Sequence, residues 1–405
     1  MNRLPDPADF APAPDSATRS RWLDADREAR PARLARLRER MAQEGVDAWF
    51  GVRPEHMRWL TGFTLGPGEK PSAGHSGEFL VSADTVTVLV DSRYAIQARR
   101  EAPDAAVDEI GYDLPGAWAR LVGGVRARRV GMEADAIPHA VWAKLAAAAP
   151  DVELVPADGW VEAMRAVKTP DEIERVAAAC AVADRALAAL LPEVRPGVTE
   201  HELALRLEWL MRTGGAECLA FDVACLAGPE AALPHGSPGD RPVLDRAVLL
   251  FDFGAQVDGY RSDMTRTLFI GEPTERDLGV YEIVARSQQA AIDALAAAVR
   301  RGGVLPDGRS IDAIARAAID GDGRWPAYGH GLGHGIGLAT NELPSLSRAA
   351  PETPLPSPTV FSVEPGVYLE GQTGVRIEDL VHLDASRGVC ELLTHFPRDV
   401  ISLPA

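Results

Sequence analysis

Apolar residues in the first 165 positions recur alternately with helical and strand spacing. The charged segment 21–44 has apolar side chains at helical spacing and ends at Gly45, whereas the later apolar runs are short and bounded by turn residues. The predicted elements are a helix over residues 21–44, strands over 48–52, 79–82, 85–90 and 129–132, and a helix over 138–149. This alternation predicts a small α/β domain over residues 21–165. It follows a Pro- and Ala-rich segment, residues 1–20, that we expect to be loosely ordered.

Helix-start signals mark the beginning of a second domain, which we place at residues 166–405. Thr169 and Glu172 form a predicted capping box with Pro170 at the first helical position. The predicted helices of this domain cover about residues 170–191, 200–213, 274–301 and 310–319. Strand patterns follow each pair of helices. The order helix, helix, strands therefore occurs twice, which predicts a pseudo-twofold α/β domain.

Residues 247–270, AVLLFDFGAQVDGYRSDMTRTLFI, place a carboxylate at the end of each of two apolar runs. The first run is a buried strand that ends at Asp252, and the second begins just after Asp263. We expect the two aspartates to face each other across one strand pair. Two carboxylates at such a short distance repel each other unless a cation lies between them, so the hairpin predicts a metal site. A polar hairpin with solvated aspartates is the alternative.

Three further segments offer ligand atoms beside glycine or an apolar strand: GHGLGHGIGL with His334, VFSVEPGVYL with Glu364 and GVRIEDLVHL with Glu378. With the two aspartates they make five donors, of which four are carboxylates. Such a set suits two ions such as Mn²⁺, Co²⁺, Zn²⁺ or Fe²⁺ better than a thiolate zinc site would. A phosphate-binding loop around His334 is excluded, since neither GxGxxG nor GxxxxGK occurs there and no helix pattern follows.

Composition narrows the class of partner. The 405 residues carry 42 Lys and Arg against 59 Asp and Glu, a net charge of −17, without a basic block. Neither nucleic acid nor an anionic membrane surface is therefore an expected partner. Four cysteines without a CxxC pair favour reduced thiols, and the chain shows no signal peptide and no apolar run of about 18 residues. We expect a cytoplasmic protein without a membrane partner.

The segments LLFDFG, YRSDMTRT, GHGIGL, VEPG and VRIED occur in an order that resembles the pita-bread metallopeptidases. This family includes methionine aminopeptidase, aminopeptidase P, prolidase and the non-metal relative creatinase. The phrases MRWLTGF and VLVDSRYAIQA resemble the N-terminal domain of aminopeptidase P, prolidase and creatinase. The resemblance implies an α/β protein with an N-terminal creatinase-like domain and a pita-bread catalytic domain. It also implies two divalent metal ions per chain, with Mn²⁺ favoured.

The resemblance also implies roles for individual residues. The implied metal ligands are Asp252, Asp263, His334, Glu364 and Glu378. Asp263 and Glu378 would bridge the two ions, and Glu364 would also handle protons in catalysis. Arg376 is similar to an arginine that steadies the ligand carboxylates, and we place it in the substrate site as well.

Three outer residues complete the predicted site. His235, in LPHGSP, matches a substrate-contacting histidine of aminopeptidase P and prolidase, and His330 matches a second pocket histidine. We assign both to catalysis and substrate binding, with an ordinary structural role as the alternative for His330. Asn341 departs from the family, since most Xaa-Pro peptidases have histidine there before an acidic residue. Asparagine can donate a hydrogen bond to an oxyanion but cannot titrate, so Asn341 is assigned to substrate binding and leaves the substrate class open.

The short spacing between Glu364 and Glu378 resembles prolidase more than aminopeptidase P. The predicted function is hydrolysis of the bond before proline in Xaa-Pro dipeptides, by a hydroxide that bridges two metal ions in each chain of a homodimer. Three alternatives stay open: aminopeptidase P activity on longer Xaa-Pro peptides, a lyase or small-molecule amidohydrolase on the same fold, and an inactive binding module. The complete ligand set disfavours the last of these.

Overall fold

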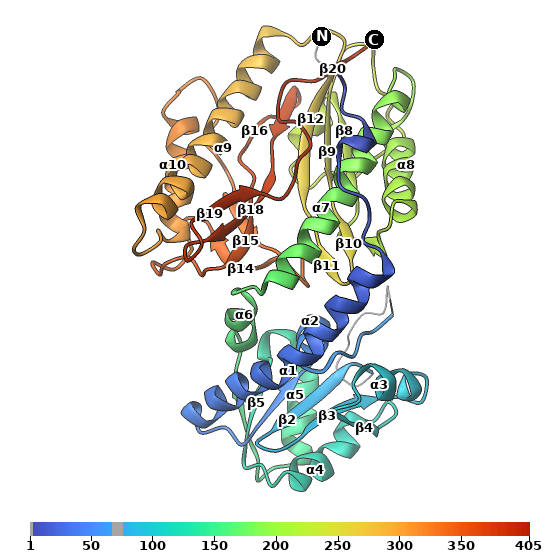
Figure 1. The fold of residues 1–405 in the computed structure, drawn as a ribbon, viewed down its shortest axis with the longest axis vertical. Helices are drawn as coiled ribbons and strands as arrows, with labels where there is room; N and C mark the ends of the chain where they lie inside the picture. Colours follow the sequence, from blue (N-terminus) through green and yellow to red (C-terminus); the bar gives the residue numbers. More distant parts are fainter. Residues whose placement is uncertain (1–2, 67–75) are drawn as a thin grey trace. The chain divides into compact units, whose positions relative to one another are not determined.

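The computed structural model describes residues 3–66 and 76–405, which form two compact units. One unit contains Ala17–Arg165, and the other contains Met1–Ser16 and Ala166–Ala405 (Figure 1). Residues 1–2 of the segment expected to be loosely ordered lie outside the described residues. The rest of that segment contains a short 3₁₀ helix, Pro7–Asp9, and the first turn of α1, Ser16–Glu44. Helix α1 therefore begins before the predicted start at residue 21.

The unit of residues 17–165 is built on one six-stranded mixed sheet with the strand order β4-β3-β2-β1-β5-β6. β1, β2 and β3 are antiparallel neighbours, whereas β4, β5 and β6 join in parallel. The strands are β1 Ala48–Gly51, β2 Glu78–Ser82, β3 Val86–Val90, β4 Ala106–Glu109, β5 Arg129–Met132 and β6 Glu153–Pro156. The helices after α1 are α2 Pro54–Thr61, α3 Ala95–Glu101, α4 Leu114–Gly124, α5 His139–Ala148 and α6 Trp160–Arg165, with a 3₁₀ turn at Ala134–Ala136. The predicted α/β class is confirmed.

Aromatic side chains fill the core of this unit. Phe50 on β1 and Trp118 on α4 are fully buried, and their rings meet edge to face with centroids 5.1 Å apart. Helix α4 was missed in the sequence, although Asp113 caps it by accepting a hydrogen bond from the N–H of Gly116 at 2.9 Å. The edge strands β4 and β6 were missed because their partly exposed residues show no clear apolar alternation.

The second unit alternates capped helices with short strands. The strands are β7 Cys218–Leu219, β8 Ala224–Ala227, β9 Ala247–Phe253, β10 Ala255–Val257, β11 Tyr260–Arg261, β12 Met264–Ile270, β13 Gly333–Gly335, β14 Glu342–Leu346, β15 Thr359–Val363, β16 Gly366–Leu369, β17 Thr373–Arg376, β18 Asp379–Asp384, β19 Val389–Leu392 and β20 Ser402–Leu403. The helices are α7 Pro170–Leu190, α8 Glu200–Thr213, α9 Glu275–Arg301 and α10 Gly308–Asp320, with 3₁₀ turns at Leu191–Glu193 and Gly228–Ala232. The predicted box at the start of α7 is confirmed: Thr169 and Glu172 exchange hydrogen bonds of 2.7 and 3.3 Å.

Two sheets carry the centre of the second unit. Their strand orders are β20-β12-β9-β8 and β14-β13-β15-β18-β19. Helix α9 packs its apolar residues against both sheets, first with Val280 and Val284 over β9 and β12, then with Leu295 over β15 and β18. Helices α9 and α10 lie on one side of these strands and α8 lies on the other (Figure 1). Among the helices in the described ranges, none has the length and apolar character needed to cross a bilayer.

A buried ion pair joins β12 to β18. Arg266, 1% exposed, places Nη2 2.6 Å from Oδ1 of Asp379, which is fully buried. The same guanidinium donates to the carbonyls of Glu378 at 2.6 Å and Phe396 at 2.7 Å. A planar cation with five donors can satisfy all these acceptors at once, so Arg266 holds together segments more than a hundred positions apart.

Replacement of Arg266 by methionine should therefore destabilise the fold strongly. The variant keeps most of the side-chain volume but leaves the buried Asp379 carboxylate without its close cation, a loss of about 3 kcal/mol or more. Urea unfolding of the metal-free protein measures this loss in the free energy of unfolding. The matched control is Arg286→Met, since Arg286 is exposed and pairs with Asp322 at 3.4 Å; its cost should stay within about 0.5 kcal/mol. Equal losses for the two variants would contradict the role of the buried pair.

Candidate metal centre

A cavity of about 800 Å³ in the second unit is lined by every residue for which the sequence predicts a role. These residues are Asp252, Asp263, His334, Glu364 and Glu378 as metal-ligand candidates, with His235, His330, Asn341 and Arg376. They come from β9, β13 and β17, from the segments beside β12, β14, β15 and β18, and, for His235, from the segment between the 3₁₀ turn Gly228–Ala232 and β9. The fold thus brings together in one cavity side chains that are up to 143 positions apart in the chain (Glu378 against His235).

The hairpin of β9 and β12 pairs Asp252 with Thr265, not with Asp263. Asp263 lies just before β12 and two residues before Thr265, so it is a diagonal neighbour of Asp252. The expectation that the aspartates face each other directly is therefore wrong. The hairpin is interrupted after β9, where the backbone of Gly254 passes so close to Ser262 that a Cβ would lie 2.0 Å from its carbonyl oxygen. A pattern of apolar residues does not reveal such an interruption.

His334 presents its Nε2 atom to the acidic residues. Its Nδ1 lies 3.0 Å from the carbonyl oxygen of Gly335, and because a carbonyl can only accept, Nδ1 carries the proton. The lone pair is then on Nε2, which lies 3.4 Å from Oε1 of Glu364 and 3.7 Å from Oδ2 of Asp263. A neutral imidazole fixed in this tautomer is the form that binds metal ions.

The two glutamates are held by neighbouring strands. Ser362 on β15 donates its hydroxyl to Oε1 of Glu364 at 3.0 Å. Gly333 beside His334 allows β13 to approach β15, because a Cβ there would lie 1.9 Å from the carbonyl oxygen of Ser362. Glu378 lies between β17 and β18, and its N–H donates to the carbonyl of Thr265 at 3.1 Å. Backbone contacts thus position both carboxylates.

The carboxylates are crowded, and those of Asp263 and Glu378 are buried. Ligand atoms of Asp263, His334 and Glu378 lie within 4.8 Å of one another. Burial, followed by the charges of neighbouring carboxylates, raises the pKa of Asp263 and that of Glu378 well above their usual ranges. Burial also raises the pKa of Glu364 to about 7. A cation among these carboxylates would favour their ionised forms.

Divalent metal ions fit this donor set. Oδ1 of Asp252 and Oε1 of Glu378 are buried, and neither accepts a hydrogen bond from the described residues. Buried carboxylate oxygens without donors are costly, and a metal ion is one way to satisfy them. Carboxylates with one imidazole suit Mn²⁺ and related ions. The residues able to hold them are Asp252, Asp263, His334, Glu364 and Glu378.

Arg376 braces these ligands. Its Nη2 donates to Oδ2 of Asp252, and its Nε donates to the hydroxyl of Thr265 at 3.0 Å. That hydroxyl in turn donates to Oε2 of Glu378 at 2.7 Å. One buried cation therefore connects carboxylates from both halves of the unit, which supports the carboxylate-holding role implied for Arg376. Thr265 joins this network as a residue to which the sequence gave no role.

His330 lies in a second hydrogen-bond chain. Nη1 of Arg376 donates to the hydroxyl of Tyr368 at 2.9 Å, and this hydroxyl lies 3.1 Å from Nε2 of His330. Nδ1 of His330 donates to the carbonyl of Gly331 at 2.8 Å. Burial lowers the pKa of His330 to about 4, so the ring is neutral at pH 7. Tyr368 was missed in the sequence; it lies half-buried on β16, the strand that follows Glu364.

His235 and Asn341 are exposed on the cavity lining. His235 follows Pro234, whose carbonyl accepts a 3.5 Å hydrogen bond from Arg376. Asn341 follows Thr340, which accepts a hydrogen bond from Arg261 at 2.9 Å. The substrate roles given to both residues stay predictions.

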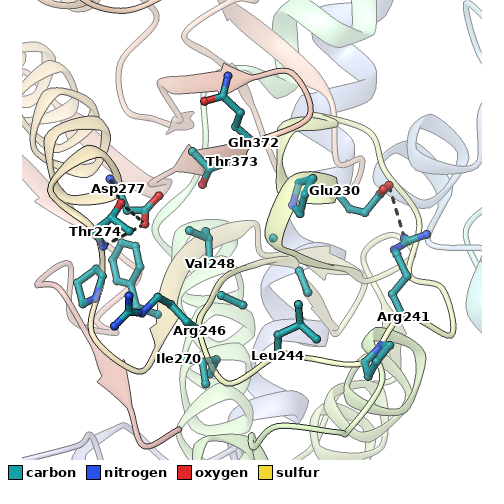
Figure 2. A pocket seen from close by; sticks show the side chains of 17 residues that line it. Glu230, Arg241, Leu244, Arg246, Val248, Ile270, Thr274, Asp277, Gln372 and Thr373 are labelled. Carbon is teal, nitrogen blue, oxygen red and sulfur yellow. Dashed lines mark hydrogen bonds and ion pairs between the residues drawn. The ribbon is translucent and has the colours of Figure 1, made fainter.

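A second cavity, of about 530 Å³, lies apart from this centre and is lined by none of the predicted site residues (Figure 2). Its lining is largely apolar, with Leu244, Val248 and Ile270 among the residues labelled in Figure 2. Two of its charged residues form an ion pair, Arg241 with Glu230 at 3.8 Å, and Arg241 also pairs more closely, at 2.6 Å, with Glu200 outside the lining. The metal-ligand chemistry of the chain is therefore concentrated in the larger cavity.

Comparison with known proteins shows the family. Residues 174–385 match the model of metallopeptidase family M24, and residues 33–167 match the creatinase/prolidase N-terminal domain. The chain belongs to metallopeptidase family M24. It is a metallopeptidase of the Xaa-Pro dipeptidase type, with a creatinase-like N-terminal domain and a pita-bread catalytic domain, as the sequence predicted. The family implies the use of a divalent metal ion, in agreement with the donor set.

Full-length relatives show the same organisation. The chain is 32% identical to the uncharacterized peptidase YqhT of Bacillus subtilis, over 92% of this chain and 100% of that protein. The X-Pro aminopeptidase of Thermotoga maritima is 33% identical, with a TM-score of 0.80 over 91% of this chain and 99% of its own. The prolidase of Pyrococcus horikoshii is 28% identical, with a TM-score of 0.81 over 91% of this chain and 100% of its own.

Proposed function

We propose that this protein hydrolyses the peptide bond before proline in Xaa-Pro dipeptides and uses two divalent metal ions per chain, with Mn²⁺ favoured. The observation that carries the proposal is the convergence of four carboxylates and the Nε2 of His334 in one cavity, with two buried carboxylate oxygens left unsatisfied. Prolidase and X-Pro aminopeptidase among the structural relatives support the choice of bond.

Bound divalent ions supply Lewis acidity and lower the pKa of water to the neutral range. The protein positions the reacting groups. Arg376 keeps Asp252 and Glu378 in place through its direct and Thr265-mediated hydrogen bonds. Glu364 faces the cavity beside His334 and is the residue placed to move a proton from the attacking water to the proline nitrogen as it leaves. His235 and His330, which line the same cavity, are proposed to contact the substrate.

Metal content provides the direct test of this proposal. Elemental analysis of the protein dialysed against Mn²⁺ should give two ions per chain, and chelation should remove hydrolysis of Ala-Pro reversibly. A single ion per chain with full activity would contradict the proposal of two metal ions.

We further propose that the protein forms a homodimer and is located in the cytoplasm. The location rests on the four free cysteines. Light scattering of the purified protein measures the oligomeric state.

Asn341 provides a second test, because it is the position at which the chain departs from its family. If its amide donates to the developing oxyanion, Asn341→Ala should lower turnover by about 10- to 100-fold with both metal ions retained. Asn341→His should keep measurable activity and change its pH profile, since histidine adds a group that titrates near neutrality. A wild type inert on all Xaa-Pro dipeptides, with hydrolysis gained in Asn341→His, would favour a lyase or amidohydrolase.

A further inference from the structure

His235 reaches the metal-site cavity from an irregular segment. It lies between the 3₁₀ turn Gly228–Ala232 and β9, and its side chain is exposed on the cavity lining. Within the part of the chain that the structure describes, the imidazole has no hydrogen-bond or ion-pair partner. The position of the ring is therefore set by the backbone that carries it, so the contacts of this segment decide where the imidazole lies.

One buried carboxylate closes this segment at both ends. Glu200, in the first turn of α8, is 0% exposed. Its Oε1 accepts a hydrogen bond from the N–H of Ala227 at 2.7 Å, and its Oε2 accepts one from the N–H of Gly239 at 2.9 Å. These two N–H groups belong to residues twelve positions apart. Residues 227–239 thus form a closed loop, called here the loop 227–239, and His235 lies within it.

Arg241 strengthens the closure just beyond the loop. Its Nη2 lies 2.6 Å from Oε2 of Glu200, and its carbonyl accepts a hydrogen bond from the N–H of Glu200 at 3.1 Å. At the other end, Ala227 is held in the sheet by the pairing of β8 with β9. The Glu200 carboxylate is the group that joins these two anchored ends. Its hydrogen bonds are charge-assisted and therefore stronger than those between neutral groups.

The other side of the loop packs against β17. A Cβ at Gly374 on β17 would lie 1.9 Å from the carbonyl oxygen of Ala231, so the two backbones are in direct contact. Nη1 of Arg376 on the same strand donates to the carbonyl of Pro234, the residue before the histidine, at 3.5 Å. Hydrogen bonds weaken with length, so the shorter bonds at Glu200 are the stronger polar restraint on the loop.

We infer that Glu200 is a positioning residue for substrate binding, because its carboxylate closes the loop 227–239 and thereby holds His235 at the lining of the metal-site cavity. The inference rests on the proposed function, in which His235 contacts the substrate. A loop already held in its binding conformation loses less conformational entropy when the substrate binds. Glu200 is not among the described residues that line the cavity, so a change at Glu200 removes no group that touches the substrate.

Replacement of Glu200 by glutamine tests the closure. Glutamine keeps the size of the side chain, but its amide has one acceptor oxygen, so its NH₂ group faces another donor at one end of the loop. We expect kcat/KM of the Mn²⁺-loaded protein on Ala-Pro to fall by about tenfold, mainly through a higher KM, with the metal content unchanged. The matched control is Glu202→Gln in the same turn of α8. Glu202 is exposed and bonds to Thr199, not to the loop, so its loss should change kcat/KM by less than about twofold.

A double-mutant cycle with His235→Ala separates positioning of the histidine from general damage to the fold. If Glu200 acts through His235, Glu200→Gln should cost less than about twofold in the His235→Ala background. A tenfold loss in both backgrounds would overturn the inference while the proposed function stands. Wild-type kcat/KM in His235→Ala would overturn it as well, because the loop would then carry no group that binds the substrate.

Hydrogen exchange tests the closure independently of activity. Peptides that cover residues 227–239 should exchange faster in Glu200→Gln than in the wild type, and they should exchange at the wild-type rate in Glu202→Gln. Unchanged exchange in Glu200→Gln would overturn the inference. Arg241→Gln, which removes the same ion pair from its exposed side, repeats both tests with the same expected direction if Glu200→Gln does not fold. A wild type that does not hydrolyse Ala-Pro would overturn the proposed function, and with it the substrate role of His235, even if the exchange result supports the closure.

Discussion

Replacement of Asp263 by alanine should abolish hydrolysis and remove at least one metal ion from the protein. Asp263 is 5% exposed, and its carboxylate lies within 4.8 Å of the ligand atoms of both His334 and Glu378. The other two carboxylates of the hairpin are engaged elsewhere, since Asp252 is held by Arg376 and Asp258 pairs with Arg175 at 2.6 Å. In the proposed two-metal site, Glu378 would remain as the one bridging carboxylate and would not hold two cations alone. Elemental analysis and turnover after Mn²⁺ loading measure both losses.

Thermal unfolding separates loss of the metal site from damage to the fold. In the metal-free protein Asp263 is a destabilised carboxyl group, because burial and the charges of Glu378 and Asp252 raise its pKa. Asp263→Ala should therefore leave the metal-free melting temperature unchanged or raise it, and it should lack the stabilisation by Mn²⁺ that we expect for the wild type. The variant Asp263→Asn keeps the shape of the side chain and should behave in the same way. Two metal ions with normal turnover in Asp263→Ala would show that the hairpin is wrongly assigned.

Replacement of Glu364 by glutamine should lower turnover by about 10²-fold or more even when the metal sites are saturated. Glutamine keeps the size of the side chain and an oxygen donor, but it cannot accept a proton. The pKa of Glu364 is raised to about 7 by burial in the metal-free protein, so this carboxyl group is readily protonated. Steady-state kinetics over a range of Mn²⁺ concentrations distinguish a weaker site from slower chemistry.

The matched control for Glu364→Gln is Ser362→Ala. This change removes the 3.0 Å hydrogen bond to Glu364 and the 3.0 Å bond that the hydroxyl accepts from the N–H of His334, but it leaves the carboxyl group in place. Its effect on turnover should be much smaller than that of the glutamine variant. Recovery of wild-type turnover by Glu364→Gln at high Mn²⁺ would reduce Glu364 to a metal ligand without a role in proton transfer.

Local sequence signals predicted much of the second unit. Helix α7 begins where Thr169 and Glu172 predicted, because a capping box depends on residues only three positions apart. The same holds for the hairpin strands, whose apolar runs mark β9 and β12. All nine residues given a role in the sequence line one cavity, since their flanking segments carried the family pattern.

Contacts between distant segments were not predictable from local pattern. The pairing of Asp252 with Thr265 depends on the interruption at Gly254, which no periodicity shows. Tyr368 entered the site only through its contacts with Arg376 and His330. The hydrogen-bond partners of these residues are set by the packing of whole sheets. A single sequence does not specify which polar residues will form hydrogen bonds with each other.

The central claim is tested most directly by measuring which peptide bond the protein cleaves, with and without its metal ions. The metal-stripped protein, before and after addition of Mn²⁺, is assayed on Ala-Pro against Ala-Ala and on Ala-Pro-NH₂ against Ala-Ala-NH₂. The account predicts no hydrolysis without metal, restored hydrolysis with Mn²⁺, and cleavage before proline far faster than before alanine in each pair. Equal cleavage before alanine, or full activity in the stripped protein, would contradict it.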